Sequence, residues 1–121
     1  MRKILESEKR VNIFTVPNDL PYKEGKEDGS EEQFHHYLNF PATLGRKYHL
    51  ILNDGRARLE VGRSVLTNKL LASNSSLMVV HDWQRPGYKP IVSKLGYRIL
   101  MEDKKSKRHL GCLLPPRDYS P

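Results

Sequence analysis

The sequence predicts a mainly β protein, a five-stranded Greek-key barrel with one short helix and a long acidic loop. Three observations carry this prediction: five runs with strand-like composition, an Asp54-Gly55 pair between two of them, and glycines inside two of them. A chain of 121 residues is long enough for one domain with its own hydrophobic core. We therefore expect a single barrel over residues 1–103 and a flexible, basic, proline-containing tail over residues 104–121.

The first three strands are expected at residues 10–17, 46–53 and 56–66. The first ends at Pro17, because proline cannot donate to a strand ladder. The second and third flank Asp54-Gly55, which tolerates the positive φ of a tight hairpin turn. Gly62 interrupts the third strand and indicates a bulge.

The last two strands are expected at residues 76–83, a nearly continuous apolar run, and at 91–101, where Gly96 is a second candidate bulge. A short helical turn carrying Leu70 and Leu71 precedes them, and Pro86-Gly87 forms the turn between them. Five strands with a helix between the third and fourth is the order of an OB-fold, a small Greek-key barrel.

Residues 18–40 carry six acidic and two basic side chains and are rich in glycine and proline. Such a segment buries too little apolar surface to offset its ordering entropy, so we expect a mobile acidic loop. The rest of the chain is basic, and the whole has a net charge of +7 and a pI near 9.6. This balance favours an anionic partner.

The single cysteine, Cys112, excludes an internal disulfide and every zinc site that needs two cysteines. The first residues are too charged for a signal peptide, and no apolar run is long enough to span a membrane. We expect an intracellular protein without a membrane partner. The basic run at residues 104–109 favours the nucleus over the cytoplasm.

Catalytic chemistry has no clear carrier in the sequence. His35 and His36 are adjacent, so a strand would point them to opposite faces, and Cys112 has no base near it. A glycine-rich phosphate loop is also missing from the sequence. We expect no enzyme activity, no metal and no cofactor.

Binding chemistry is better represented. Lys47 and His49 share one strand face, Arg56 and Arg58 share a face of the next, and in a hairpin the four form one cationic patch. Trp83 and Tyr88 flank a basic turn and are candidates for base stacking. The expected nucleic-acid-binding residues are Lys47, His49, Arg56, Arg58, Arg63, Trp83, Arg85, Tyr88 and Lys89. Tyr97 and, alternatively, Trp83 itself are candidates for the core.

The stretch KYHLILNDG, followed by RARLEVGRSVLTNKLL, resembles two strands and a helix of OB-fold proteins of the replication protein A kind. The closest likeness is to the N-terminal domain of the large subunit, and it covers about residues 10–101. The resemblance implies a groove whose cations are Lys47, His49 and Lys89. In that family the N-terminal domain binds acidic peptides and sister domains bind single strands.

The leading hypothesis is a module that binds single-stranded DNA or RNA within a genome-maintenance complex. The alternative is a protein-interaction module, in which a basic groove takes an acidic peptide or the chain is one subunit of a larger complex. There the tail would dock a partner through Leu110, Leu113 and Leu114. A small viral protein that targets a host complex would fit the same pattern. The stretch LEVGRS also resembles forkhead-associated domains, but Ser76 and His81 have the wrong spacing for them.

Overall fold

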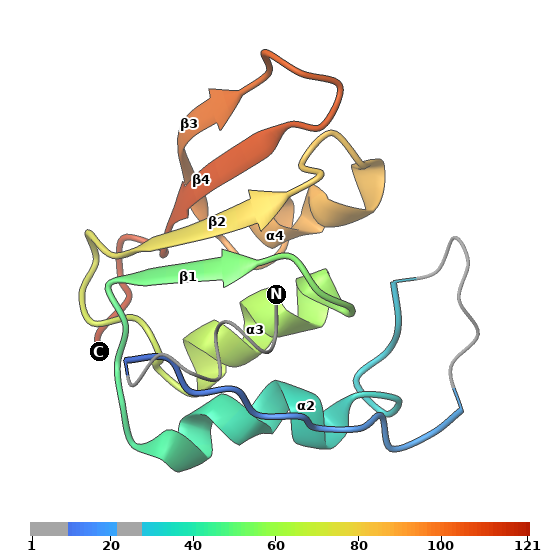
Figure 1. Cartoon of the computed structure of the whole chain (residues 1–121). Helices are drawn as coiled ribbons and strands as arrows, with labels where there is room; N and C mark the ends of the chain where they lie inside the picture. Colours follow the sequence, from blue (N-terminus) through green and yellow to red (C-terminus); the bar gives the residue numbers. More distant parts are fainter. Residues whose placement is uncertain (1–9, 22–27) are drawn as a thin grey trace.

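Figure 1 shows a computed structural model of the chain, which describes residues 10–21 and 28–121. Four strands form one open sheet in the order β1-β2-β4-β3. The strands are β1 (Leu50–Asn53), β2 (Leu77–His81), β3 (Arg98–Asp103) and β4 (Leu110–Leu114). The helices are α2 (His35–Asn39), α3 (Arg58–Thr67) and α4 (Pro90–Ser93), and the 3-10 turns are η1 (Phe40–Leu44) and η2 (Pro86–Tyr88).

The expected five-stranded barrel is wrong, because the sheet is mixed and open. Strand β1 runs parallel to β2, and β4 runs antiparallel to both β2 and β3. Parallel neighbours cannot be joined by a tight turn, so the chain between β1 and β2 crosses over through α3. The two edges of the sheet are β1 and β3.

The expected hairpin at residues 46–66 is also wrong beyond β1. Its second arm forms α3, whose buried residues are Arg58, Gly62 and Val65, a helical spacing. Asp28 fixes the start of α3: its carboxylate accepts a hydrogen bond from the Arg58 N–H, and its carbonyl accepts one from the Ala57 N–H at 2.7 Å. The third strand predicted from the sequence is therefore the crossover helix.

The hydrophobic core lies between one face of the sheet and the helices α3 and α4. It contains Val65 from α3, Ile91 from α4, and inward-facing strand residues such as Met78 and Leu113. Helix α2 packs on α3 in turn, so it forms a further layer below the helices that cover the sheet (Figure 1). The opposite face of the sheet has no covering layer among the described residues.

Several further expectations fail in the same region of the chain. Residues 91–101 split into the end of α4, a turn at Gly96 and the start of β3. The segment expected to be a flexible tail contains β4, which lies between β2 and β3. The central strand expected at residues 76–83 is confirmed as β2.

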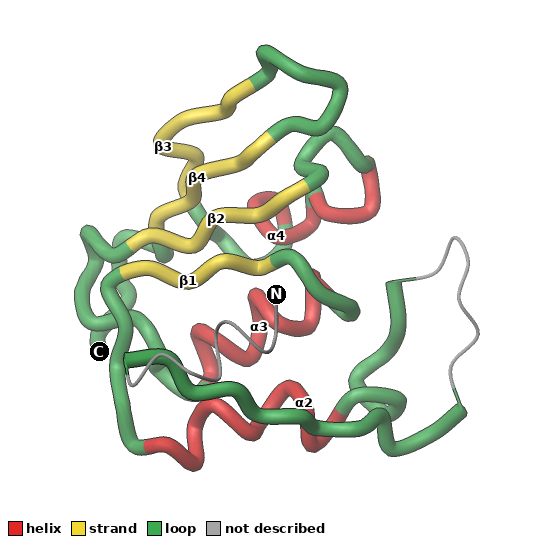
Figure 2. The backbone as a smooth tube through the Cα atoms, viewed as in Figure 1, coloured by secondary structure: helices red, strands yellow, loops and turns green. Residues whose placement is uncertain are grey.

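The N-terminal segment, residues 10–17, was expected to be a strand and has no regular secondary structure. Figure 2 shows this segment as a loop that runs alongside α2. Asp19 ties the end of this segment to α2, because its carboxylate contacts both the backbone N–H and Nδ1 of His36. The expected acidic loop at 18–40 includes α2, and its residues 22–27 lie outside the described residues.

Candidate functional site

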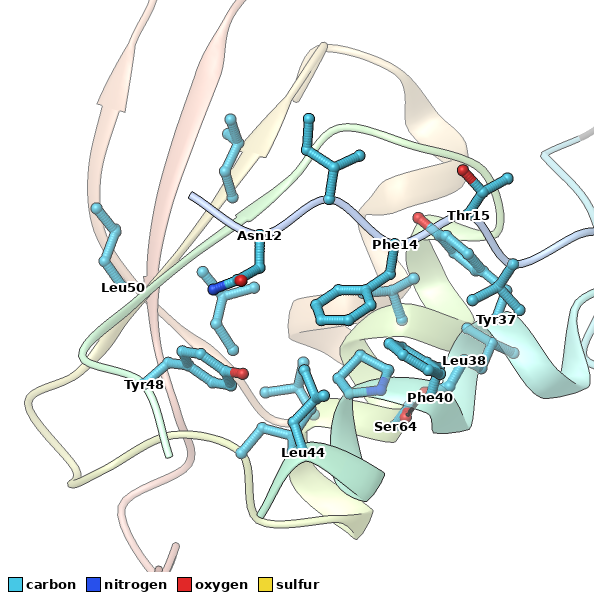
Figure 3. Close-up of a pocket in the computed structure, with 18 of the residues that line it drawn as sticks. Asn12, Phe14, Thr15, Tyr37, Leu38, Phe40, Leu44, Tyr48, Leu50 and Ser64 are labelled. Atoms are coloured by element: carbon cyan, nitrogen blue, oxygen red, sulfur yellow. Dashed lines mark hydrogen bonds between the residues drawn. The ribbon is translucent and has the colours of Figure 1, made fainter. Parts of the chain in front are cut away.

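An apolar hollow of about 830 Å³ lies beside the free edge of β1. Four parts of the chain line it: the extended segment 11–16, the α2–η1 region, β1 and α3. Figure 3 shows Phe14 and Phe40 on its wall, and Tyr48 and Leu50 on the β1 side. The ring centroids of Phe14 and Phe40 are 5.1 Å apart. Most of the lining is hydrophobic, and Asn12, Thr15 and Ser64 are among its few polar members.

Strand β1 presents two leucines to the outside of the sheet. Leu50 and Leu52 are 61% and 65% exposed, whereas Ile51 packs against the core and Asn53 is buried. The sequence predicted the alternation of these side chains correctly. It did not predict that the leucine face points to solvent, because the covered face depends on where α3 and α4 pack.

The backbone of β1 is paired on one side only. Within residues 10–21 and 28–121, the strand has β2 as its single neighbour in the sheet. Just before β1, Tyr48 also pairs on this side, because its N–H donates to Leu70 O at 2.7 Å and its carbonyl accepts from Ala72 N at 2.8 Å. The other edge of β1, which borders the hollow, has no strand partner among those described residues.

Three cationic or titratable side chains stand where β1 begins. Arg46, Lys47 and His49 are exposed, and none of them forms an ion pair with a carboxylate in the described part of the chain. The Lys47 Nζ donates to the carbonyl of Lys69 at 2.7 Å, which holds its side chain at this end of the strand. Lys47 and His49 were expected to be groove cations; neither of them lines the hollow, although the adjacent residues Tyr48 and Leu50 do.

A polar cluster joins the carboxyl ends of β1 and β2. The Arg58 guanidinium is buried and donates to the carbonyls of Gly55 (2.9 Å) and His81 (2.5 Å). It also lies 3.2 Å from an Asp54 oxygen and 3.7 Å from an Asp82 oxygen. Arg58 therefore holds the two strand ends together, and its charge is not available to an external ligand.

Asp82 and His81 complete this cluster. The His81 Nδ1 lies 3.2 Å from Asp54 and 3.4 Å from Asp82. Burial acts to raise the pKa of the Asp82 carboxyl, but the neighbouring His81 and Arg85, a hydrogen bond from Gln84 and the Arg58 charge together hold this pKa below its usual range. Asp82 has a φ of 57° and Ala57 a φ of 54°, so the backbone is strained after both strands. No group of three metal-ligating side chains occurs in the described residues.

The aromatic residues expected to stack on bases are in the core. Trp83 is 0% exposed and Tyr88 is 4% exposed. The Trp83 Nε1 donates to Glu102 at 2.8 Å, and Lys89 Nζ lies 4.1 Å from the indole ring. The alternative that Trp83 belongs to the core is confirmed, as is the expectation for Tyr97. Stacking platforms must be accessible, so these rings supply none.

The remaining candidate residues are spread over the molecule. Arg56 is half-buried before α3, and Arg63 is exposed on α3 and pairs with Glu60 at 3.0 Å. Arg85 and Lys89 are exposed, near the carboxyl end of β2. Leu110, Leu113 and Leu114 are strand residues of β4, and Leu113 is fully buried. The cationic patch expected from a hairpin is therefore not assembled.

No family model, curated protein or solved structure matches the chain. The resemblance to replication protein A thus remains a hypothesis, while the barrel that it implied is wrong. No helix among the described residues has the length and apolar character needed to span a membrane.

Proposed function

We propose that this chain is a protein-interaction module that takes an extended segment of a partner protein along the free edge of β1. The observation that carries the proposal is an edge strand with exposed leucines that opens onto an apolar hollow and has no second strand partner in the described residues. This is recognition by strand addition, in which backbone hydrogen bonds give affinity and pockets for alternate side chains give specificity.

The composition of β1 supports this function. Soluble proteins usually protect a sheet edge with lysine, proline, a bulge or a covering element. Strand β1 has the sequence Leu-Ile-Leu-Asn, which contains no lysine and no proline. Parallel strands are also usually covered on both faces, yet Leu50 and Leu52 are the most exposed large hydrophobic side chains in the described residues. A partner would cover them.

The hollow supports a peptide as the occupant. Its volume of about 830 Å³ lies within the range of small-molecule pockets, so size alone does not identify the occupant. A small apolar ligand would leave the backbone groups of the β1 edge unpaired. An extended segment would pair them and place every second side chain in the hollow.

The charges at the start of β1 indicate which segment fits. Arg46, Lys47 and His49 lack acidic partners in the described part of the chain, so an acidic residue beside them would gain a favourable contact. The segment we expect is apolar at alternate positions and acidic at the end that meets Arg46 and Lys47. The absence of enzyme activity remains a prediction.

The test uses a synthetic fluorescent peptide with two aspartates followed by alternating valine and threonine. Saturable binding should newly protect from hydrogen exchange the amides of Leu50 and Leu52, which face the free edge, because those of residues 51 and 53 face β2. Leu52→Lys should weaken binding by on the order of 10- to 100-fold, because a charge then faces the added strand and an apolar contact is lost. The variant should fold, since Leu52 is exposed.

The matched control is Leu100→Lys on β3, the other edge of the sheet, where the side chain is 59% exposed. It should leave binding unchanged. Changing Arg46 and Lys47 to glutamate should weaken binding of the acidic peptide. The same variant should bind a peptide that has two lysines in place of the aspartates. The proposal would be contradicted if Leu52→Lys and Leu100→Lys lost equal peptide affinity, or if the peptide did not protect the β1 amides from exchange.

A further inference from the structure

The most concentrated positive charge outside the β1 site lies in the turn between β3 and β4. Lys104, Lys105, Lys107 and Arg108 are all exposed there. None of them forms an ion pair with a carboxylate in the part of the chain that the structure describes. Four unpaired cations in five residues repel one another, and an external polyanion would relieve that repulsion.

Hydrogen bonds within the turn give it a defined shape. The Asp103 carboxylate accepts from the Lys105 N–H at 3.0 Å, and the Ser106 hydroxyl donates to the Arg108 carbonyl at 2.8 Å. The Arg108 N–H donates back to the Ser106 oxygen at 3.2 Å. The cations are thus presented on an ordered hairpin end, not on the flexible tail that the sequence predicted.

The loop after β2 extends the same basic surface. The backbone N–H of Trp83 donates to the His109 carbonyl at 3.0 Å, and the backbone N–H of His109 donates to the Gln84 side chain at 2.8 Å. These two hydrogen bonds hold the loop against the base of the turn. Arg85 and Lys89 are exposed on it. Each has an acidic neighbour, Asp82 at 3.6 Å and Glu102 at 4.0 Å, so their charges are partly compensated.

The chemistry of this surface suits phosphate groups spaced along a chain. Spaced cations on a convex turn contact successive phosphates, whereas a single small anion needs a pocket, and neither described pocket is lined by residues of this turn. The neighbouring rings of Trp83 and Tyr88 are buried, so bases find no stacking surface here. Binding without stacking depends on phosphate density, which is highest in a duplex.

We propose that the β3–β4 turn binds the phosphate backbone of double-stranded nucleic acid without regard to sequence. The sequence led us to expect a single-stranded nucleic acid on another surface; this proposal instead places a double strand at the β3–β4 turn. This surface is independent of the β1 edge, because β1 and β3 are the two opposite edges of the sheet. Losing one function should leave the other intact.

The test compares a labelled DNA duplex of about 20 base pairs with a single strand of the same length, by fluorescence anisotropy between about 50 and 200 mM salt. The duplex should bind more tightly. Removing all four cations, as K104S/K105S/K107S/R108S, should reduce the slope of log affinity against log salt by about 3 to 4. A milder variant, K105Q/K107Q, should reduce it by about half as much.

The matched control removes four cations at the opposite end of the strands, as R46S/K47S/K69N/R117S. It has the same net charge as the first variant and should change the slope by less than about 1. Circular dichroism and thermal unfolding confirm that each variant is folded. Similar slope changes in the first variant and the control would show that only net charge matters and would overturn the proposal.

Two further outcomes would also overturn it. Tighter binding of the single strand than of the duplex would mean that bases, not phosphates alone, are contacted. Binding to phosphatidylserine vesicles without binding to the duplex would assign the turn to an anionic membrane surface instead. The vesicle measurement is needed because apolar residues next to the turn, such as Leu100 and Met101 on β3, are exposed and could contact a membrane surface.

Discussion

At the scale of single residues, the packing of Trp83 depends on Gly111. Gly111 lies in β4 opposite Val80, and the indole ring occupies the space that a side chain at this position would need. The ring's N–H is satisfied by Glu102, which lies 19 residues further along the chain. Sequence reasoning left Trp83 undecided between surface and core, because neither Gly111 nor Glu102 could be recognised as its neighbour.

Gly111→Ala should destabilise the protein by about 1–3 kcal/mol. A Cβ at this position would lie 2.7 Å from two atoms of the indole ring, so the ring or the strand must move. Urea denaturation measures the loss as a lower midpoint with an unchanged slope. Gly87→Ala is the control, since its Cβ meets nothing within 4 Å, and equal stability of the two variants would contradict this packing.

At the scale of elements, residues 56–66 fit two periodicities. Ala57, Leu59 and Val61 alternate as in a strand, whereas Arg58, Gly62 and Val65 recur as on a helix. The helix forms because β1 and β2 are parallel and need a long crossover between them. The sequence contains both patterns, and the choice between them depends on a strand pairing that only the folded sheet reveals.

Strands β1 and β2 could be predicted because each lies in a short sequence segment rich in apolar residues. The candidate site was predicted only in part. Lys47 and His49 are next in sequence to residues that line the hollow but do not line it themselves, and the free edge of β1 is a property of the sheet order, which the sequence does not show. Asp54-Gly55 was expected to form a hairpin turn, whereas the chain bends at Gly55 and leads from a strand into a helix.

Gly62→Ala distinguishes the two structures of residues 56–66. In α3 an added Cβ would make ordinary contacts, the nearest at 3.4 Å to Leu95, and alanine would gain about 0.5–1 kcal/mol of helix stability. At a strand bulge the same change would be destabilising. Gly96→Ala is the comparison: φ is +84° there, so thermal unfolding should show a gain for the first variant and a loss for the second.

At the scale of the whole molecule, the sheet is completed by the end of the described chain. Strand β4 pairs with both β2 and β3, so it links the parallel pair to the edge that carries the basic turn. Leu113 of β4 is fully buried in the core, and the Tyr119 hydroxyl beyond it donates to the Leu71 carbonyl at 2.7 Å. The two proposed surfaces therefore depend on one strand that neither of them contains.

Ending the chain after His109 keeps the basic turn but removes β4, so it tests this dependence. Without β4, strand β3 has no neighbour in the sheet and β2 has only β1, so Met78 and Val80 lose part of their cover. We expect the cooperative thermal transition to disappear, because removing a central strand exposes the core and its backbone groups. Ending the chain after Tyr119 removes only the exposed Ser120 and Pro121 and should leave the transition unchanged. If the shorter chain instead unfolded cooperatively at the same temperature, the segment from residue 110 onward would be dispensable, as the composition of the tail predicted, and neither surface would depend on β4.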